Sequence, residues 1–396
     1  MLSFISRSSH GEGAECSPTI TAIGANHFWI LDAGIFLCLA HMMKTLLTAM
    51  ITWALCVGSA LAEPHSQHAG GHGHGGHSNG AVTDQAPIGL GGGRSHGAGA
   101  LMFALRYGVM GMSGLQDGTQ SLSEAELLDP SGSYQYRVVP RSMRTQMVMA
   151  SAMYSPSRYL TVSAMVPYVF KEMDMVTRMG QGFRTRSNGF GDVGLFLMSP
   201  LVDSKEFYLQ VKLGLSFPSG SINQQDRTPM SGASETQLPY LMQIGSGTWD
   251  LIPSVSIGGA KGSIAWGGRI AGVVRTSTNE NGYRFGNIYS ITGWGEWAFT
   301  PWLAVSLRLA WQDTYAIEGV DSRLPSNASA MTPSADPEYL GRRQFDGFIG
   351  FQVLGQEGLL AGYGFAVEAG LPLWQSTTGP GLARSYFVTL GFTKNL

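Results

Sequence analysis

The histidines of this chain are gathered at one end of it. All nine precede residue 97, and the residues from there to the end include neither histidine nor cysteine. Neutral imidazole is a common ligand of Zn, Cu and Ni, and flexible spacers let several imidazoles converge on one ion. We therefore predict a Cu-, Zn- or Ni-binding segment, the alternative being a soluble tether whose metal affinity is incidental. The candidate ligands are His65, His68, His72, His74 and His77.

The body of the chain lacks the groups on which many hydrolytic enzymes depend. Without histidine, no Ser–His or Asp–His arrangement can supply a general base. Chemistry that uses only Asp and Glu stays open, but no motif marks it, so an enzyme is the weakest alternative. We expect a non-enzymatic protein with no catalytic residues and no required cofactor.

Residues 43–62 have the pattern of a secretory signal peptide. Lys44 provides the positive start, an apolar run follows, and Ala60-Leu61-Ala62 forms a small-residue cleavage site. This segment is too short and wrongly flanked for a stable membrane-spanning helix.

The regions on either side of the signal peptide show no globular pattern. Residues 1–42 are interpreted as an over-long start, the alternative being that the whole of 1–62 is an unusually long leader. All three cysteines precede Glu63, so the mature chain is expected to have no disulfide. Residues 63–97 are polar and rich in His and Gly, and we expect them to be disordered.

The composition of the body is that of a membrane β-barrel. Charged residues make up 13% of the chain, about half of the roughly 25% usual in soluble domains, and glycines number 54. After the signal peptide, no stretch reaches the roughly 20 apolar residues that a spanning helix needs. The net charge of −2 and the absence of basic runs argue against nucleic acid as a partner. The alternative, a secreted soluble β-sandwich, would be poorly soluble at so low a charge.

Apolar and polar residues alternate with period two, which is typical of strands. In 205–217, for example, Phe207, Leu209 and Leu213 share one apolar face. Short and long connections alternate, so we predict an all-β, transmembrane, antiparallel up-and-down β-barrel of about 12 strands, covering 98–396. The predicted strands are 99–112, 143–155, 158–172, 188–201, 205–217, 245–259, 262–275, 285–299, 302–315, 343–354, 359–373 and 383–393.

The two strand faces have opposite expected environments. Aromatic residues around two short turns are expected to form a girdle at the membrane surface: Tyr154, Tyr159, Trp297, Phe299 and Trp302. Mid-strand charges would be costly in lipid, about 2–4 kcal/mol for Arg or Lys, so we predict that they face the lumen. Both signs occur, which favours a bracing network over a substrate relay. The lumen-facing candidates are Arg106, Arg144, Asp192, Lys212, Asp250, Arg269, Glu296, Arg308, Asp346 and Glu368.

Three segments of the body carry glycine-rich motifs in a fixed order. They consist of Gly189, Gly191 and Asp192, then Phe217, Pro218, Ser219 and Gly220, then Gly245, Ser246, Gly247 and Asp250. This pattern resembles the outer-membrane family of the MetA pathway of phenol degradation, a family of transporter-like proteins. The resemblance covers about 98–396, is strongest over 189–259, and does not include the His-rich segment.

The resemblance implies a channel or transporter of the bacterial outer membrane for small, aromatic or hydrophobic molecules. The implied partners are outer-membrane lipid, small-molecule solutes and the barrel assembly machinery, which reads a terminal aromatic residue. Here the chain ends four residues after Phe392. A metal-related outer-membrane protein, in which the His-rich periplasmic segment captures Cu, Zn or Ni, is the main alternative, and a barrel enzyme without histidine is the second.

Deletion of residues 63–80 is expected to abolish Cu(II) or Ni(II) binding, measured by calorimetry on the detergent-solubilised protein. Binding by the intact chain should fade below about pH 6, because protonated imidazole (unperturbed pKa about 6.5) has no lone pair to donate. Metal binding that survives the deletion would place the ligands in the body of the chain.

Overall fold

The computed structural model describes residues 86–90, 97–204 and 206–396. The chain divides into two compact units, Met1–Gly76 and His77–Leu396, and every described residue belongs to the second. The predictions of a signal peptide, an over-long start and a His-rich metal segment fall outside the described residues. Within the described part, no helix has the length and apolar character to cross a membrane.

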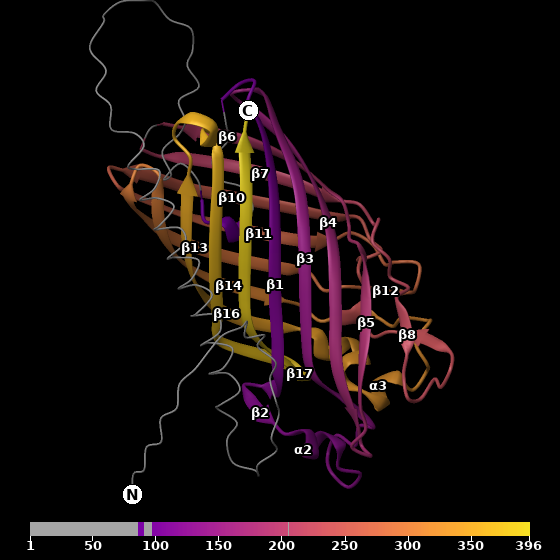
Figure 1. Cartoon of the computed structure of the whole chain (residues 1–396). Helices are drawn as coiled ribbons and strands as arrows, with labels where there is room; N and C mark the ends of the chain where they lie inside the picture. The colour runs from indigo at the N-terminus through magenta and orange to yellow at the C-terminus, as the bar shows by residue number, and fades with distance from the viewer. Residues whose placement is uncertain (1–85, 91–96, 205) are drawn as a thin grey trace, which may run out of the picture. The chain divides into compact units, whose positions relative to one another are not determined.

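The fold is a closed antiparallel β-barrel, as predicted. Of the thirteen strands in its sheet, β2 and β5 lie off the ring, which leaves eleven strand elements in the described part of the wall. Pairing of β17 with β1 closes the ring (Figure 1). The wall consists of β1 (Leu101–Gly118), β3 (Val138–Ser157), β4 (Leu160–Thr177), β6 (Gly194–Asp203), β7 (Tyr208–Ser216), β10 (Asp250–Lys261), β11 (Ile264–Arg275), β13 (Ile288–Thr300), β14 (Leu303–Thr314), β16 (Arg342–Leu354) and β17 (Tyr363–Asn395).

The last element, β17, crosses the wall twice. Its 364–377 part pairs with β16, and its 377–395 part pairs with β1. The two parts lie side by side, since Asn395 N donates to Gly362 O at 2.9 Å. The eleven elements therefore make twelve crossings. The long connection predicted between the strands 359–373 and 383–393 is wrong, because the chain reverses there within a continuous strand element.

Other predicted boundaries differ near the long loops. The single strand expected at 188–201 is broken, with β5 (Gly182–Phe190) and β6 separated at residues 191–193. The strands β1, β3 and β4 run further than predicted. The outer part of β4, for example, carries Asp174, which pairs with Arg184 of β5 at 2.7 Å. Such charged side chains disrupt the apolar alternation on which the prediction relied.

The long loops carry the remaining short elements, which gather at one end of the barrel (Figure 1). The helix α2 begins with a capping box, in which hydrogen bonds from Ser123 lower the pKa of Glu126. These elements are β2 (Gln120–Leu122), α2 (Glu124–Leu128), β8 (Gln225–Arg227), β9 (Glu235–Gln237), η3 (Tyr240–Met242), β12 (Tyr283–Arg284), β15 (Glu318–Gly319), α3 (Ala328–Met331), η4 (Pro333–Ala335) and η5 (Pro337–Leu340). The other end carries η6 (Gly358–Leu360) in a short connection.

Glycine and aromatic residues pair across neighbouring strands and account for part of the glycine content. In each pair, the aromatic ring occupies the space that a β carbon on the opposite glycine would need. A larger residue at these glycines would displace the ring. The pairs are Gly111–Tyr386, Gly214–Phe196, Gly258–Tyr208, Gly267–Trp294 and Gly370–Phe348.

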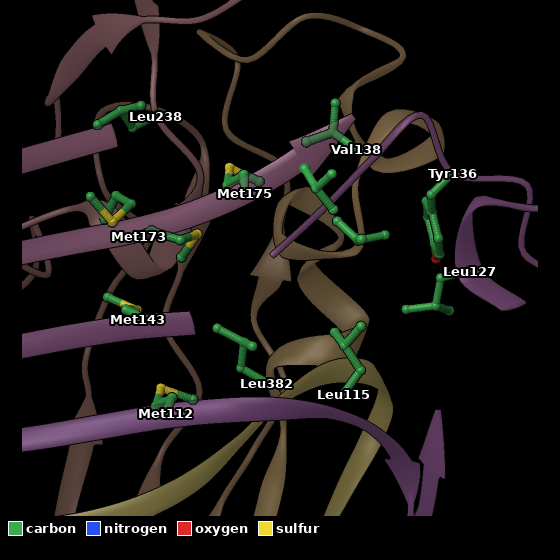
Figure 2. Close-up of a cluster of buried hydrophobic side chains, with 13 residues drawn as sticks. Met112, Leu115, Leu127, Tyr136, Val138, Met143, Met173, Met175, Leu238 and Leu382 are labelled. Atoms are coloured by element: carbon green, nitrogen blue, oxygen red, sulfur yellow. The ribbon is translucent and has the colours of Figure 1, made fainter. Parts of the chain in front are cut away.

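The mouth of the barrel at the long-loop end is filled by a hydrophobic core. Met112, Met143 and Met173 lie on the neighbouring strands β1, β3 and β4 and pack with loop residues such as Leu238 (Figure 2). Lys171 anchors this loop, donating from Nζ to the carbonyl oxygens of Leu241, at 2.8 Å, and Gln243. The long loops therefore close over the mouth.

Side-chain exposure alternates along β14, and this provides a test of which face of the strand contacts lipid. Leu307 is 61% exposed on the outer face, whereas its neighbours Ser306 and Arg308 are buried. Leu307→Arg is expected to cost about 2–4 kcal/mol of folding free energy in lipid. The readout is the fraction of protein with heat-modifiable gel mobility, which should fall. Leu307→Phe is the matched control and should assemble normally; equal assembly of both variants would show that this face does not contact lipid.

Candidate functional site in the barrel lumen

A short segment of the chain ahead of β1 lies inside the barrel. It is the 3-10 turn η2 (Ile88–Leu90). Arg269 on β11 donates from Nη1 to the carbonyl oxygen of Leu90. A β carbon on Gly89 would overlap the Glu368 carboxylate, and one on Gly391 would overlap the side chain of Ile88. The segment thus contacts β11 and β17 and occupies part of the lumen.

The turn η2 rests on a buried ion pair. Arg308 on β14 binds Glu368 on β17 through two parallel contacts, from Nε to Oε2 at 3.0 Å and from Nη2 to Oε1. The side chains are 8% and 2% exposed. The guanidinium carbon also lies 3.5 Å from the ring centroid of Phe348. The two parallel contacts and the stacked ring together compensate the buried charges of Arg308 and Glu368.

Seven of the ten predicted lumen-facing residues lie at mid-strand on the inner face of the wall. Besides Arg308 and Glu368, Glu296 accepts from Gln352 and Asp346 accepts from Gln344, both through side-chain amides. Arg269 also donates from Nε to Ser256 Oγ at 2.9 Å. The two remaining residues, Arg106 and Lys212, line a cavity in the lumen.

Asp192 lies between β5 and β6, and Asp250 is the first residue of β10, which corrects the predicted mid-strand position of both. Asp250 has the same parity as the buried Ser254 and Ser256 of β10. The Asp192 carboxylate accepts from the backbone N–H groups of Gly220 and Ser246, each at 2.8 Å. Asp250, 1% exposed, accepts from Thr248 Oγ1 at 2.6 Å and pairs with Arg275. The reason is that β6 and β10 begin later than predicted, so both carboxylates hold loop turns.

The three glycine-rich motifs therefore meet in space. Asp192 of the first motif binds both later motifs through Gly220 and Ser246. A β carbon on Gly220 would lie 2.7 Å from the α carbon of Gly245, so the two backbones touch. The motifs build a structural junction at the rim, and their spacing alone did not predict it.

Arg144 faces outward, which is the third correction. Its neighbour Met143 is buried in the mouth core, while Arg144 is exposed and lies opposite Glu172 of β4. With 20 residues at about 3.3 Å each, β3 is roughly 66 Å long. Even when tilted, it extends well beyond an apolar band about 25 Å tall, so a charge near its outer end is solvated.

The cavity in the lumen has a volume of about 330 Å³. The turn η2 forms one side of it, and strands β1, β3, β4, β6, β7, β10 and β17 contribute the rest. Its lining includes four methionines, Met149, Met153, Met165 and Met198, together with Phe196. The lumen-facing residues predicted from the sequence do not include these methionines. Met149 and Met153 share the strand parity of the buried Met143, and this parity was the signal that could have placed them inside.

A second hollow lies against the outer face of the same stretch of wall. It is a groove of about 810 Å³ whose lining includes the exposed side chains of Leu197, Leu213 and Ile270. Met198 and Lys212 line both the groove and the lumen cavity. The two hollows therefore lie on opposite sides of β6 and β7.

Metal-ligating residues do not gather in the described part of the chain. Among residues 86–90, 97–204 and 206–396, His, Cys, Asp and Glu form no group of three or more that could hold an ion. The five candidate histidines lie outside this part.

Comparison with known proteins supports the fold. No protein-family model and no curated protein matches this chain. Among solved structures, the COG4313 outer membrane channel from Pseudomonas putida F1 is 11% identical with a TM-score of 0.51, covering 76% of this chain and 97% of that one. A FadL homologue from Pseudomonas aeruginosa (7% identity, TM-score 0.37, 75% and 90% covered) and the NanC porin (8%, 0.37, 74% and 100%) are more distant. The first likeness shows that this chain has the fold of bacterial outer-membrane barrels.

Removal of one partner of the lumen ion pair should be more harmful than removal of both. Arg308→Met leaves Glu368 buried and uncompensated, with an expected loss of about 3–5 kcal/mol in the free energy of unfolding. The double variant Arg308→Met/Glu368→Met should recover most of that loss, because no buried charge remains. Urea unfolding in lipid vesicles measures the free energy of unfolding of the single and the double variant. Additive losses in the double variant would show that the two side chains do not act as a pair.

Proposed function

We propose that this protein is a channel of the bacterial outer membrane for small, apolar or aromatic molecules, and that it is related to the MetA-pathway of phenol degradation family. The observation that carries the proposal is the lumen cavity, whose walls are mostly thioether, aromatic and aliphatic side chains. Its volume of about 330 Å³ is at the lower end of the range for small-ligand sites. A general porin for polar solutes would instead have a wide, water-filled lumen.

The contents of the lumen support a selective channel over an open pore. The turn η2 occupies the lumen near its ion pair, and the hydrophobic core fills the mouth. The apolar groove outside β6 and β7 gives solutes dissolved in the membrane a place next to the lumen cavity. Passage then requires local movement of side chains, for which flexible methionines are suited.

Uptake of an apolar fluorescent probe tests this function. Expression in Escherichia coli should raise the rate at which N-phenylnaphthylamine enters cells, because the intact outer membrane excludes it. Ser163→Trp, which fills the lumen cavity, should remove the increase. Leu307→Trp, on the outer face and away from both the groove and the cavity, is the matched control and should keep it. Unchanged probe uptake together with fast permeation of arabinose in liposome swelling would indicate a general polar pore and overturn the proposal.

A metal-related function is the second candidate. It is favoured by one observation, the five histidines within residues 63–80. In that case the segment captures Cu, Zn or Ni in the periplasm, and the barrel serves as its membrane carrier. Growth of cells under copper stress, compared with and without residues 63–80, tests this candidate, which requires that the deletion change growth. If the protein is a channel only, the deletion should leave both growth and probe uptake unchanged.

A further inference from the structure

Two cations at the lumen cavity lack an anionic partner. Arg106 on β1 and Lys212 on β7 both line the cavity, and its lining contains no Asp or Glu. Within the described residues, neither side chain takes part in an ion pair, and Arg106 Nε is buried without a hydrogen-bond partner. Lys212 Nζ instead lies 5.0 Å from the ring centroid of Phe196.

Several other buried cations of the wall have partners. Arg308 pairs with Glu368, and Arg275 pairs with Asp250. Lys171 donates to two backbone carbonyl oxygens. Arg384 has no ion pair among the described residues, but it does not line the cavity. A buried charge without a partner is costly, and an anion bound beside it offsets that cost. Two such cations on one small cavity therefore favour a ligand that carries negative charge.

The rest of the cavity favours an apolar body on that ligand. Met149, Met165, Phe196 and Ile252 line it together with Ile88 of η2. Methionine side chains adapt to different shapes and make favourable contacts with aromatic rings. A volume of about 330 Å³ accommodates a body of one or two aromatic rings or a short alkyl chain.

We propose that the lumen cavity is a binding site for small amphipathic carboxylates, with the carboxylate held between Lys212 and Arg106 and the apolar body against the methionine-lined wall. This inference rests on the proposed channel function and names its substrate class. A carboxylate accepts charge-assisted hydrogen bonds from both cations, which a neutral molecule of the same shape cannot do to the same extent.

The test compares 2-naphthoate with the neutral 2-naphthylmethanol. Full-length protein in lipid nanodiscs is titrated into each compound, and binding is followed by the anisotropy of naphthalene fluorescence. We expect 2-naphthoate to bind at least tenfold more tightly than the alcohol. Lys212→Met and Arg106→Met should each weaken 2-naphthoate binding at least tenfold and leave binding of the alcohol unchanged or stronger.

The controls separate charge from folding. Arg144→Met removes a cation from the outer face and should leave 2-naphthoate binding unchanged, and Lys212→Arg should retain it. Heat-modifiable gel mobility verifies that each variant is assembled. Equal binding of the two compounds, or equal loss in Arg144→Met and Arg106→Met, would overturn the carboxylate site. If uptake of N-phenylnaphthylamine persists in that case, the channel function stands; if uptake also fails, the proposed function fails with it.

Discussion

The constraint on which this structure depends is that lipid offers no hydrogen-bond partner to the backbone. Every N–H and C=O group within the membrane must therefore pair inside the protein, and a sheet can achieve this only by closing. Here closure depends on the ladder between β1 and β17, which runs from Met102–Asn395 to Gly118–Thr377. The reversal within β17 supplies the last crossing, so the chain begins and ends its wall at the same seam.

Closure creates an interior that is sheltered from both lipid and bulk water. Charged side chains in that interior therefore need partners within the protein or a bound ligand. Arg308 and Glu368 neutralise each other, and their carboxylate and guanidinium also leave room only for a glycine at position 89. The acids Glu296 and Asp346 each bind a side-chain amide. Arg106 and Lys212 have no ion-pair partner among the described residues and both line the cavity, so their charge is available to a ligand there.

The sequence predicted the barrel and most inward charges because both follow local rules, the period of two and the cost of charge in lipid. These rules failed at positions that lie outside the apolar band or outside a strand. Arg144 lies where β3 has left the apolar band, and Asp192 lies between two strands, where it binds the rim junction. The position of η2 depends on distant contacts with Arg269 and Glu368, which no local pattern in Ile88–Leu90 could reveal.

The methionines show why composition alone could not describe the lumen. Thioether side chains are tolerated by lipid, loops and protein interiors alike, so only the parity of the wall strands assigns them to the inside. Met102, Met153 and Met198, from β1, β3 and β6, pack together as a buried cluster beside the cavity that Lys212 and Arg106 line. Fixed charges thus lie next to unbranched, flexible side chains. Such a site can hold the position of an anionic group while it adapts to the shape of the apolar body attached to it.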